Sequence, residues 1–220
     1  MKIPPLLSRR RVLAASGACA TFAAVGGSVL AAEQLRRTPT QALGPFYPLE
    51  KPLDHDADMT LVKGHKERAK GQVVHVMGRV LNADGQPVKG ARIEIWQANT
   101  HGRYTHPSDS NPAPLDPNFE GYAKLLTDAE GRYRFKTIKP APYPAGDFIR
   151  PAHIHFDVAG RLNRLVTQMY FPGDPNNADD LVLAIATKNK QLLMAEIRPP
   201  TADLEPDSLL AHWDIVLEQG

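Results

Sequence analysis

The sequence predicts an all-β fold: an antiparallel β-sandwich with long functional loops, an irregular N-terminal arm and one or two short helices. Three observations support this class. Short runs with alternating apolar residues recur from residue 71 onward, turn signals rich in Asn, Asp and Gly separate them, and one segment near the C-terminus has apolar residues at helical spacing. Several short strands at such intervals are typical of a sandwich whose loops carry the function.

Residues 1–31 have the composition of an export signal. Arg9, Arg10 and Arg11 precede an uncharged run rich in Ala and Gly, and Val29-Leu30-Ala31 has the small-residue pattern of a cleavage site. The segment resembles a twin-arginine signal peptide, so we expect it to be removed and the protein to be periplasmic or secreted. The alternatives are a retained membrane anchor and a lipid attachment site at Cys19.

The charge balance excludes several classes of protein. The chain has 26 Lys and Arg against 24 Asp and Glu, and residues 1–31 hold four basic side chains and no acidic one, which leaves 22 basic against 24 acidic. A mildly acidic chain without clustered basic residues does not indicate nucleic-acid binding. The single cysteine lies in the signal segment, so the processed chain can form no disulfide and has no thiolate ligand or nucleophile. We expect no stable membrane span after processing.

Residues 32–70 are polar and rich in proline, and we expect an irregular arm laid over the surface of a sandwich domain that spans residues 71–220. Within this arm the block from Leu43 to Pro48 combines turn formers with two aromatic residues. We expect the block to pack as a hydrophobic plug under the arm; the alternative is that Tyr47 borders a pocket.

Two β-hairpins are predicted at the start of the sandwich domain. The first joins residues 73–81 to residues 91–96 through an Asn-Ala-Asp-Gly turn, and the second joins residues 122–126 to residues 133–138 through an Asp-Ala-Glu-Gly turn. Strict alternation in residues 91–96 indicates a strand with one buried face.

The rest of the chain continues the strand series. Residues 153–158 and 165–171 are predicted strands, and residues 212–217 are predicted to form a final strand. Between them, the segment from Asp179 to Ile197 is expected to form one or two short helices.

Two histidines on one predicted strand are the first candidate functional residues. Alternate side chains of a strand share a face, so His153 and His155 point the same way and can bind a metal together, although the pair also fits a polar strand surface. Tyr104, in a loop, and Tyr143, held between two prolines, are candidate partners. Each tyrosine taken alone would more often be a packing residue.

Six sequence blocks together resemble the intradiol ring-cleavage dioxygenases, and within that family most resemble the protocatechuate 3,4-dioxygenase β subunits. The match runs in order from about Gly44 to the C-terminal strand. The blocks are Trp96-Gln97-Ala98-Asn99, Gly102-Arg103-Tyr104, Leu115-Asp116-Pro117-Asn118-Phe119, Ile138 to Pro144, Arg150 to Phe156, and Gln168 to Phe171. The resemblance implies an enzyme that uses non-haem Fe(III) and O2 to cleave a catechol-type ring between its two hydroxyl-bearing carbons, giving a cis,cis-muconate-type diacid.

The resemblance also implies a ligand set for the iron, namely Tyr104, Tyr143, His153 and His155. Ferric iron is a hard ion, and anionic phenolate oxygens offset its charge in a partly dry pocket. In the family mechanism the tyrosinate at the position of Tyr143 leaves the metal when the catechol binds and takes up a substrate proton.

Two further residues match positions near the substrate in this family. The resemblance implies that Arg150 lies over the ring and stabilises charge that develops during attack by O2, and that Gln168 lies near the same pocket. The alternative for Arg150 is a salt bridge to a nearby carboxylate.

One departure from the family pattern concerns the pocket. Pro144 is followed by Ala145, where the β subunits often have Trp, so the pocket wall is expected to differ and the identity of the catechol is left open. The expected partners are a catechol-type small molecule and O2, with a homo-oligomer or an αβ-type partner subunit. The alternative function is a non-catalytic, transthyretin-like binding module, which would have no need of the four ligands and Arg150.

Overall fold

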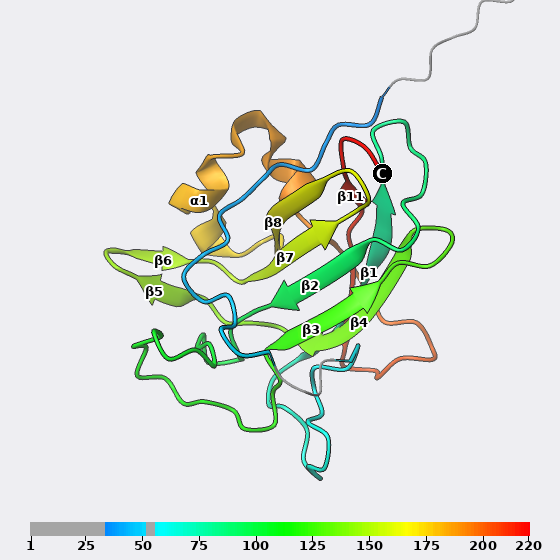
Figure 1. Ribbon diagram of the computed structural model, residues 1–220. Helices are drawn as coiled ribbons and strands as arrows, with labels where there is room; N and C mark the ends of the chain where they lie inside the picture. The colour runs from blue at the N-terminus through cyan, green and yellow to red at the C-terminus, as the bar shows by residue number, and fades with distance from the viewer. Residues whose placement is uncertain (1–33, 52–55) are drawn as a thin grey trace, which may run out of the picture. The chain divides into compact units, whose positions relative to one another are not determined.

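Two β-sheets packed face to face form the body of the protein (Figure 1). The computed structural model describes residues 34–51 and 56–220, so the predicted signal segment lies outside the described residues. The first sheet has four antiparallel strands in the order β3-β2-β7-β8. These strands are β2 Arg92–Trp96, β3 Tyr122–Leu126, β7 His153–Ala159 and β8 Arg164–Tyr170. The predicted all-β sandwich class is confirmed.

The second sheet is built around its central strand β1, Val73–Leu81. One edge of β1 pairs antiparallel with β4, and the other edge pairs parallel with β10 and β11, so this sheet is mixed rather than purely antiparallel. The remaining strands of the sheet are β4 Arg132–Ile138, β9 Glu196–Arg198, β10 Leu209–His212 and β11 Ile215–Val216. A separate two-stranded ribbon joins β5, Tyr143–Ala145, to β6, Phe148–Arg150.

Short helical elements follow β8. They are η1 Pro175–Asn177, α1 Leu181–Ala184 and η2 Thr187–Leu193. The α-helix begins at Asp180, whose carboxylate accepts a hydrogen bond from the Leu183 backbone N–H, as an N-cap residue does. The prediction of one or two short helices within residues 179–197 is confirmed. None of the helices within the described residues has the length and apolarity that crossing a bilayer requires.

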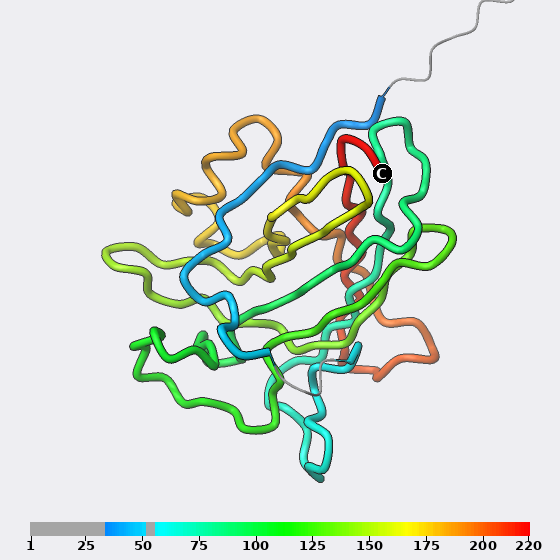
Figure 2. Tube along the Cα trace, viewed as in Figure 1, coloured from blue at the N-terminus to red at the C-terminus, as the bar shows by residue number. Residues whose placement is uncertain are grey.

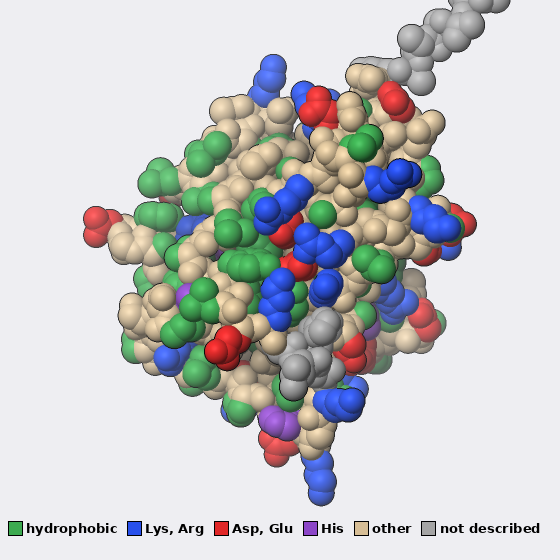
Figure 3. Space-filling view, in the orientation of Figure 1, with side chains coloured by type: hydrophobic (Ala, Val, Ile, Leu, Met, Phe, Trp, Pro, Cys, Tyr) green, Lys and Arg blue, Asp and Glu red, His purple; other side chains and the backbone are tan. Residues whose placement is uncertain are grey.

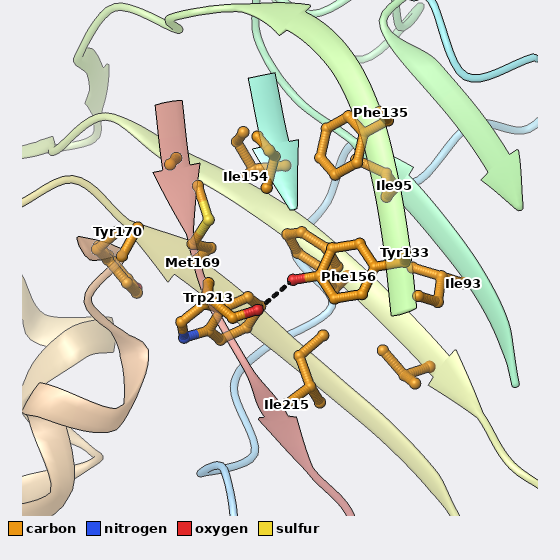
Figure 4. Packing of buried hydrophobic residues seen from close by; sticks show 14 of the residues in the cluster. Ile93, Ile95, Tyr133, Phe135, Ile154, Phe156, Met169, Tyr170, Trp213 and Ile215 are labelled. Atoms are coloured by element: carbon orange, nitrogen blue, oxygen red, sulfur yellow. Dashed lines mark hydrogen bonds between the residues drawn. The ribbon is translucent and has the colours of Figure 1, made fainter. Parts of the chain in front are cut away.

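Side chains of β2 and β7 alternate between the core and the outer face of the four-stranded sheet. Ile95 of β2 and Ile154 and Phe156 of β7 are fully buried in the core between the sheets, around Trp213 (Figure 4). Tyr133 closes this core by donating a hydrogen bond from its hydroxyl to the carbonyl oxygen of Trp213, at 2.6 Å. Because side chains alternate along a strand, the residues between these core positions project from the outer face of the four-stranded sheet.

The two predicted hairpins are wrong in their pairing. Strand β1 pairs with β4 and strand β2 pairs with β3, so each predicted hairpin joins strands of different sheets. The turns themselves form, since Gly85 donates its N–H to the carbonyl of Asn82 and Gly131 donates to that of Asp128. A turn sequence fixes only the local chain reversal, whereas the partners of a strand depend on packing over the whole domain.

The final strand, predicted over residues 212–217, is split into β10 and β11 by a backbone excursion at Trp213. Trp213 donates its N–H to the Met77 carbonyl at 2.9 Å, and Asp214 accepts the Arg79 N–H at 2.8 Å. Between these two contacts a Cβ at Gly78 would lie 1.8 Å from the Trp213 carbonyl oxygen. Only glycine at position 78 allows this approach of two backbones.

We predict that Gly78→Ala destabilises the protein by about 3 kcal/mol, because the added methyl forces β1 away from Trp213. The matched control is Gly90→Ala, where no atom lies within 4 Å of the new Cβ and the cost is the left-handed backbone alone, about 1 kcal/mol. Urea unfolding of both variants measures the difference. Equal losses in the two variants would contradict the role assigned to this contact.

The part of the predicted arm at residues 34–51 runs across the outer face of the four-stranded sheet (Figure 2). This segment contains no helix or strand, and four hydrogen bonds attach it to β8, one of which joins the Tyr170 hydroxyl to the Gln41 side-chain oxygen at 3.1 Å. Gln41 donates its N–H to the Val166 carbonyl, the Thr167 hydroxyl donates to the Pro39 carbonyl, and the Gln168 amide donates to the Ala42 carbonyl. The arm therefore covers the face from which the alternating polar residues of β7 and β8 project.

Two buried carboxylates on this outer face form ion pairs with basic side chains of the arm and of the sheet itself. Glu94 of β2 and Asp157 of β7 are cross-strand partners, and each is only 1% exposed. Lys51 and Arg92 pair with Glu94, and Arg164 binds Asp157 through two hydrogen bonds of 2.9 and 2.8 Å. Figure 3 shows basic side chains gathered with acidic ones across the middle of this face. Desolvation acts to raise the pKa of Glu94, but hydrogen bonds from Lys51 and Tyr47 outweigh it and lower this pKa to about 2.

Candidate metal centre

His153 and His155 project side by side from the outer face of β7. Ile154 between them points into the core, as the alternation of a strand requires. The two Nε2 atoms lie 3.2 Å apart, and each histidine is 2% exposed. The sequence-predicted pair is therefore brought together, in a buried position rather than on a polar surface.

Burial keeps both imidazoles uncharged. Desolvation, reinforced by the nearby positive charge of Arg150, lowers the pKa of His153 to about 3, and desolvation also lowers the pKa of His155 well below its usual value. In neutral His153 the Nδ1 atom lies 2.7 Å from the Pro151 carbonyl oxygen, which can only accept, so Nδ1 carries the proton. The Nε2 lone pair of His153 is therefore free to bind a metal.

The two tyrosines predicted as partners lie beside the histidines. The rings of Tyr104 and Tyr143 meet edge to face with centroids 5.5 Å apart, and the Tyr143 hydroxyl lies 3.5 Å from His153 Nε2. The Tyr104 ring is 6.2 Å from that of His155. Burial raises the pKa of both phenols. The buried Tyr104 hydroxyl has no hydrogen-bond partner among the described residues, which is costly for a polar atom unless a ligand binds it.

Local hydrogen bonds place the loop that carries Tyr104. The Asn99 side chain accepts the backbone N–H groups of His101 and Arg103, and the Tyr104 N–H donates to Asp109 at 2.7 Å. The Asn99 carbonyl accepts the N–H of Ala141, which ties this loop to the segment that leads into Tyr143. Two tyrosines that are 39 positions apart in the sequence thus reach one site.

Aromatic packing and a glycine hold the ligand side chains in place. Trp96 stacks on His155 with ring centroids 4.8 Å apart, and Phe46 of the arm packs on Tyr104 at 4.7 Å. Gly44 has a φ of +76°, and a Cβ there would lie 3.0 Å from Cε1 of His155. A side chain at position 44 would therefore be strained and would crowd this histidine.

The four side chains fit a hard trivalent cation. They supply two phenol oxygens and two neutral imidazole nitrogens, in a buried site where one phenol lacks a partner. In the part of the chain that the structure describes, no three His, Cys, Asp or Glu residues form a cluster that could hold a metal. A metal at this position would thus depend on the tyrosines.

Arg150 and Gln168 form a buried network next to the four side chains. Arg150 donates to Asp180 at 2.6 Å and to the Gln168 side-chain oxygen at 2.7 Å. Tyr170, which stacks on His153 with centroids 5.7 Å apart, donates to the same Gln168 oxygen at 2.8 Å. The salt bridge considered as the alternative role of Arg150 is therefore present. Gln168 is fully buried beside His155, its partner across the strands, and its side-chain oxygen accepts from Arg150.

A cavity of about 610 Å³ opens onto this site. Tyr143 and Arg150 line it, and Phe46 and Gly44 of the arm form one side. Phe46 thus borders the pocket, whereas its neighbour Tyr47 packs on Trp96 with ring centroids 5.0 Å apart and donates to Glu94. The predicted packing role of Tyr47 is confirmed. The block from Leu43 to Pro48 thus both packs against the sheet and forms part of the cavity wall.

The sequence alone did not reveal Asp180, Tyr170, Gly44 and Phe46 as parts of the site. Asp180 directly precedes an apolar run, which signals a helix cap but gives no sign of an ion pair with Arg150. Tyr170 could have been found from its position two residues after Gln168 on one strand face.

The fold and the site together define a ring-cleavage dioxygenase of the intradiol class. A family model described as Dioxygenase matches residues 43–219, and the chain belongs to this family, whose members are oxidoreductases that use non-haem iron. The resemblance seen in the sequence is confirmed, and the non-catalytic binding module is not favoured.

Among named proteins, the protocatechuate 3,4-dioxygenase beta chain of Burkholderia cepacia is 52% identical over 181 residues, which cover 79% of this chain and 76% of the relative. Hydroxyquinol 1,2-dioxygenase of Rhizobium sp. (strain MTP-10005) is 33% identical over 171 residues, covering 71% of this chain and 54% of the relative. This chain therefore spans about half the length of the hydroxyquinol enzyme.

A solved structure of a dioxygenase domain has a fold similar to that of this chain. The dioxygenase domain of a dioxygenase carbohydrate-binding protein fusion from Streptomyces sp. SirexAA-E superposes with a TM-score of 0.63 at 25% identity. The match covers 84% of this chain and 100% of that domain. The sandwich with its loops is thus sufficient to match an entire dioxygenase domain.

We predict that Asp180→Ala destabilises the protein by about 3 to 5 kcal/mol, because it leaves the buried Arg150 guanidinium without its counter-charge. The neighbouring Asp179 is exposed, so Asp179→Ala is the matched control and should change stability by less than about 0.5 kcal/mol. Chemical unfolding monitored by tryptophan fluorescence compares the two. A similar, small effect in both variants would show that Arg150 does not depend on this ion pair.

Proposed function

We propose that this chain is the iron-binding, catalytic chain of an intradiol dioxygenase that opens the ring of a catechol between its two hydroxyl-bearing carbons. The observation that carries the proposal is the convergence of four side chains, one of which, Tyr143, also lines the cavity; the four are Tyr104, Tyr143, His153 and His155. The reaction adds both atoms of O2 to the catechol, which gives a cis,cis-muconate-type diacid without any further oxidant.

In this proposal the four converging side chains hold Fe(III). Two phenolates offset two of the three charges of a ferric ion, and the neutral imidazoles add no charge. Because burial raises the pKa of both phenols, their deprotonation requires a strong positive charge beside them. Ferric iron held by these residues would supply Lewis acidity that activates a catechol ring toward O2.

The protein side chains then have separate tasks. Tyr143, which lines the cavity, accepts a proton from a catechol hydroxyl as the substrate binds. Arg150, fixed by Asp180 and Gln168, presents a rigid cation that stabilises negative charge developing on the ring. Gln168 acts as a positioning residue, because it orients Arg150 and does not line the cavity. Phe46 and the surrounding aromatic rings limit the access of water.

The experiment that tests the proposed function supplies the iron-loaded protein with catechol and ¹⁸O2. The expected result is one O2 consumed per catechol and a ring-opened diacid that carries two labelled oxygen atoms, seen by mass spectrometry. An aldehyde product from cleavage beside the diol, or no product with any diol, would refute the proposal.

We predict that Tyr143→Phe lowers kcat by about 100-fold or more, because the variant cannot accept the substrate proton. The matched control is Tyr47→Phe, a nearby tyrosine that packs outside the cavity and should leave kcat within about twofold of the unchanged enzyme. Steady-state O2 uptake with catechol measures both. Equal rates for the two variants would remove Tyr143 from the mechanism.

The same proposal includes assembly with other chains. The B. cepacia relative is named as a beta chain, which favours an αβ-type oligomer, and a homo-oligomer is the second arrangement. Exposed apolar side chains next to the cavity support an interface there, since Leu181 and Ile185 are 64% and 67% exposed and flank Val182 in the cavity wall. Light scattering of the purified protein gives the oligomeric state.

We also propose that the protein is exported through the twin-arginine pathway. The support is the arginine run before an uncharged segment at the N-terminus. Fractionation of cells with and without a functional twin-arginine translocase tests this export. The processed protein should be found outside the cytoplasm only in cells that have the translocase.

A further inference from the structure

The cavity is larger than an unsubstituted catechol requires. Its volume is about 610 Å³, whereas a closed cavity of about 150 Å³ is enough to hold a benzene ring. Residues of the β5-β6 ribbon form one wall of this cavity. The walls of the cavity therefore determine which ring substituents fit.

The β5-β6 ribbon presents small and apolar residues to the cavity. Its register pairs Tyr143 with Arg150 and Ala145 with Phe148, and all four line the cavity. Ile149, between two of them, is 46% exposed and does not line it. With only a methyl group at Ala145, this wall leaves room for a substituent on the substrate ring.

The charges around the cavity do not favour an acidic substituent. Among the described lining residues, Arg150 is the single Lys or Arg side chain, and its charge is offset by Asp180 at 2.6 Å. Asp109, which also lines the cavity, brings a negative charge. A carboxylate on the substrate ring would thus lose its hydration without gaining a cation of its own from the described residues of this chain.

We propose, on the basis of the proposed function, that the substrate is an uncharged catechol with a bulky apolar substituent. The substituent lies against Ala145, Phe148 and Val182 while the two hydroxyl groups face Tyr143. This specificity differs from that named for the B. cepacia relative, since protocatechuate carries a ring carboxylate.

The first test compares kcat/KM of the iron-loaded full chain for 4-tert-butylcatechol, catechol and protocatechuate. The expected order is 4-tert-butylcatechol first and protocatechuate last, with at least about a tenfold difference between these two. Dissociation constants measured anaerobically by calorimetry should follow the same order, which separates binding from turnover. Preference for protocatechuate in either measurement would overturn the proposal.

The second test narrows the cavity. Ala145→Trp should lower kcat/KM for 4-tert-butylcatechol by about tenfold or more and weaken its binding, while catechol is affected less than about threefold. Ile149→Trp adds the same bulk to the outer side of the same ribbon and should leave both substrates within about twofold of the unchanged enzyme. Equal effects of Ala145→Trp on the two substrates would show that the substituent does not contact this wall.

The outcomes distinguish this inference from the function on which it depends. If protocatechuate is cleaved fastest, the substrate inference fails and the intradiol function stands. If no diol is bound or cleaved, the proposed function fails, and the inference fails with it.

Discussion

Strand β7 is buried on both faces, and the site depends on this double burial. One face places Ile154 and Phe156 in the core between the sheets, and the other carries the buried His153 and His155, the second of which lies against Gly44 of the arm. A strand held in this way has no freedom to shift its register, because a slip by one residue would move the histidines into the apolar core. The pairing of β7 with β2 and β8 then fixes Trp96 and Gln168 on either side of His155.

The arm and the hydrogen-bonded network around Arg150 set the environment of the two histidines. Burial lowers the pKa of both histidines, so the two imidazoles are neutral, and Gly44 of the arm lies against His155. The buried pair of Arg150 and Asp180 adds one fixed cation at the cavity and joins β6 to the cap of α1. Since a buried ion pair is seldom a source of stability in itself, its presence here is consistent with a role in holding Arg150.

The sequence predicted the class of fold and the members of the candidate site better than it predicted the pairing of strands. Alternation at Ile154 and Phe156 showed which way His153 and His155 point, because that property is local to one strand. The partners of β1 and β2 depend on burial over the whole domain, so the turns at Asn82 and Asp128 were misleading. The Tyr104 and Tyr143 pair was recognised by resemblance, since no local pattern brings two distant loops together.

Binding of one ferric ion by two tyrosinates and two histidines is measured by the visible absorption spectrum together with the iron content of the purified protein. We expect about one iron atom per chain and a tyrosinate-to-Fe(III) charge-transfer band, which weakens in Tyr104→Phe. A protein that takes up no stoichiometric iron, or a band that is unchanged in Tyr104→Phe, would contradict the assignment of these residues.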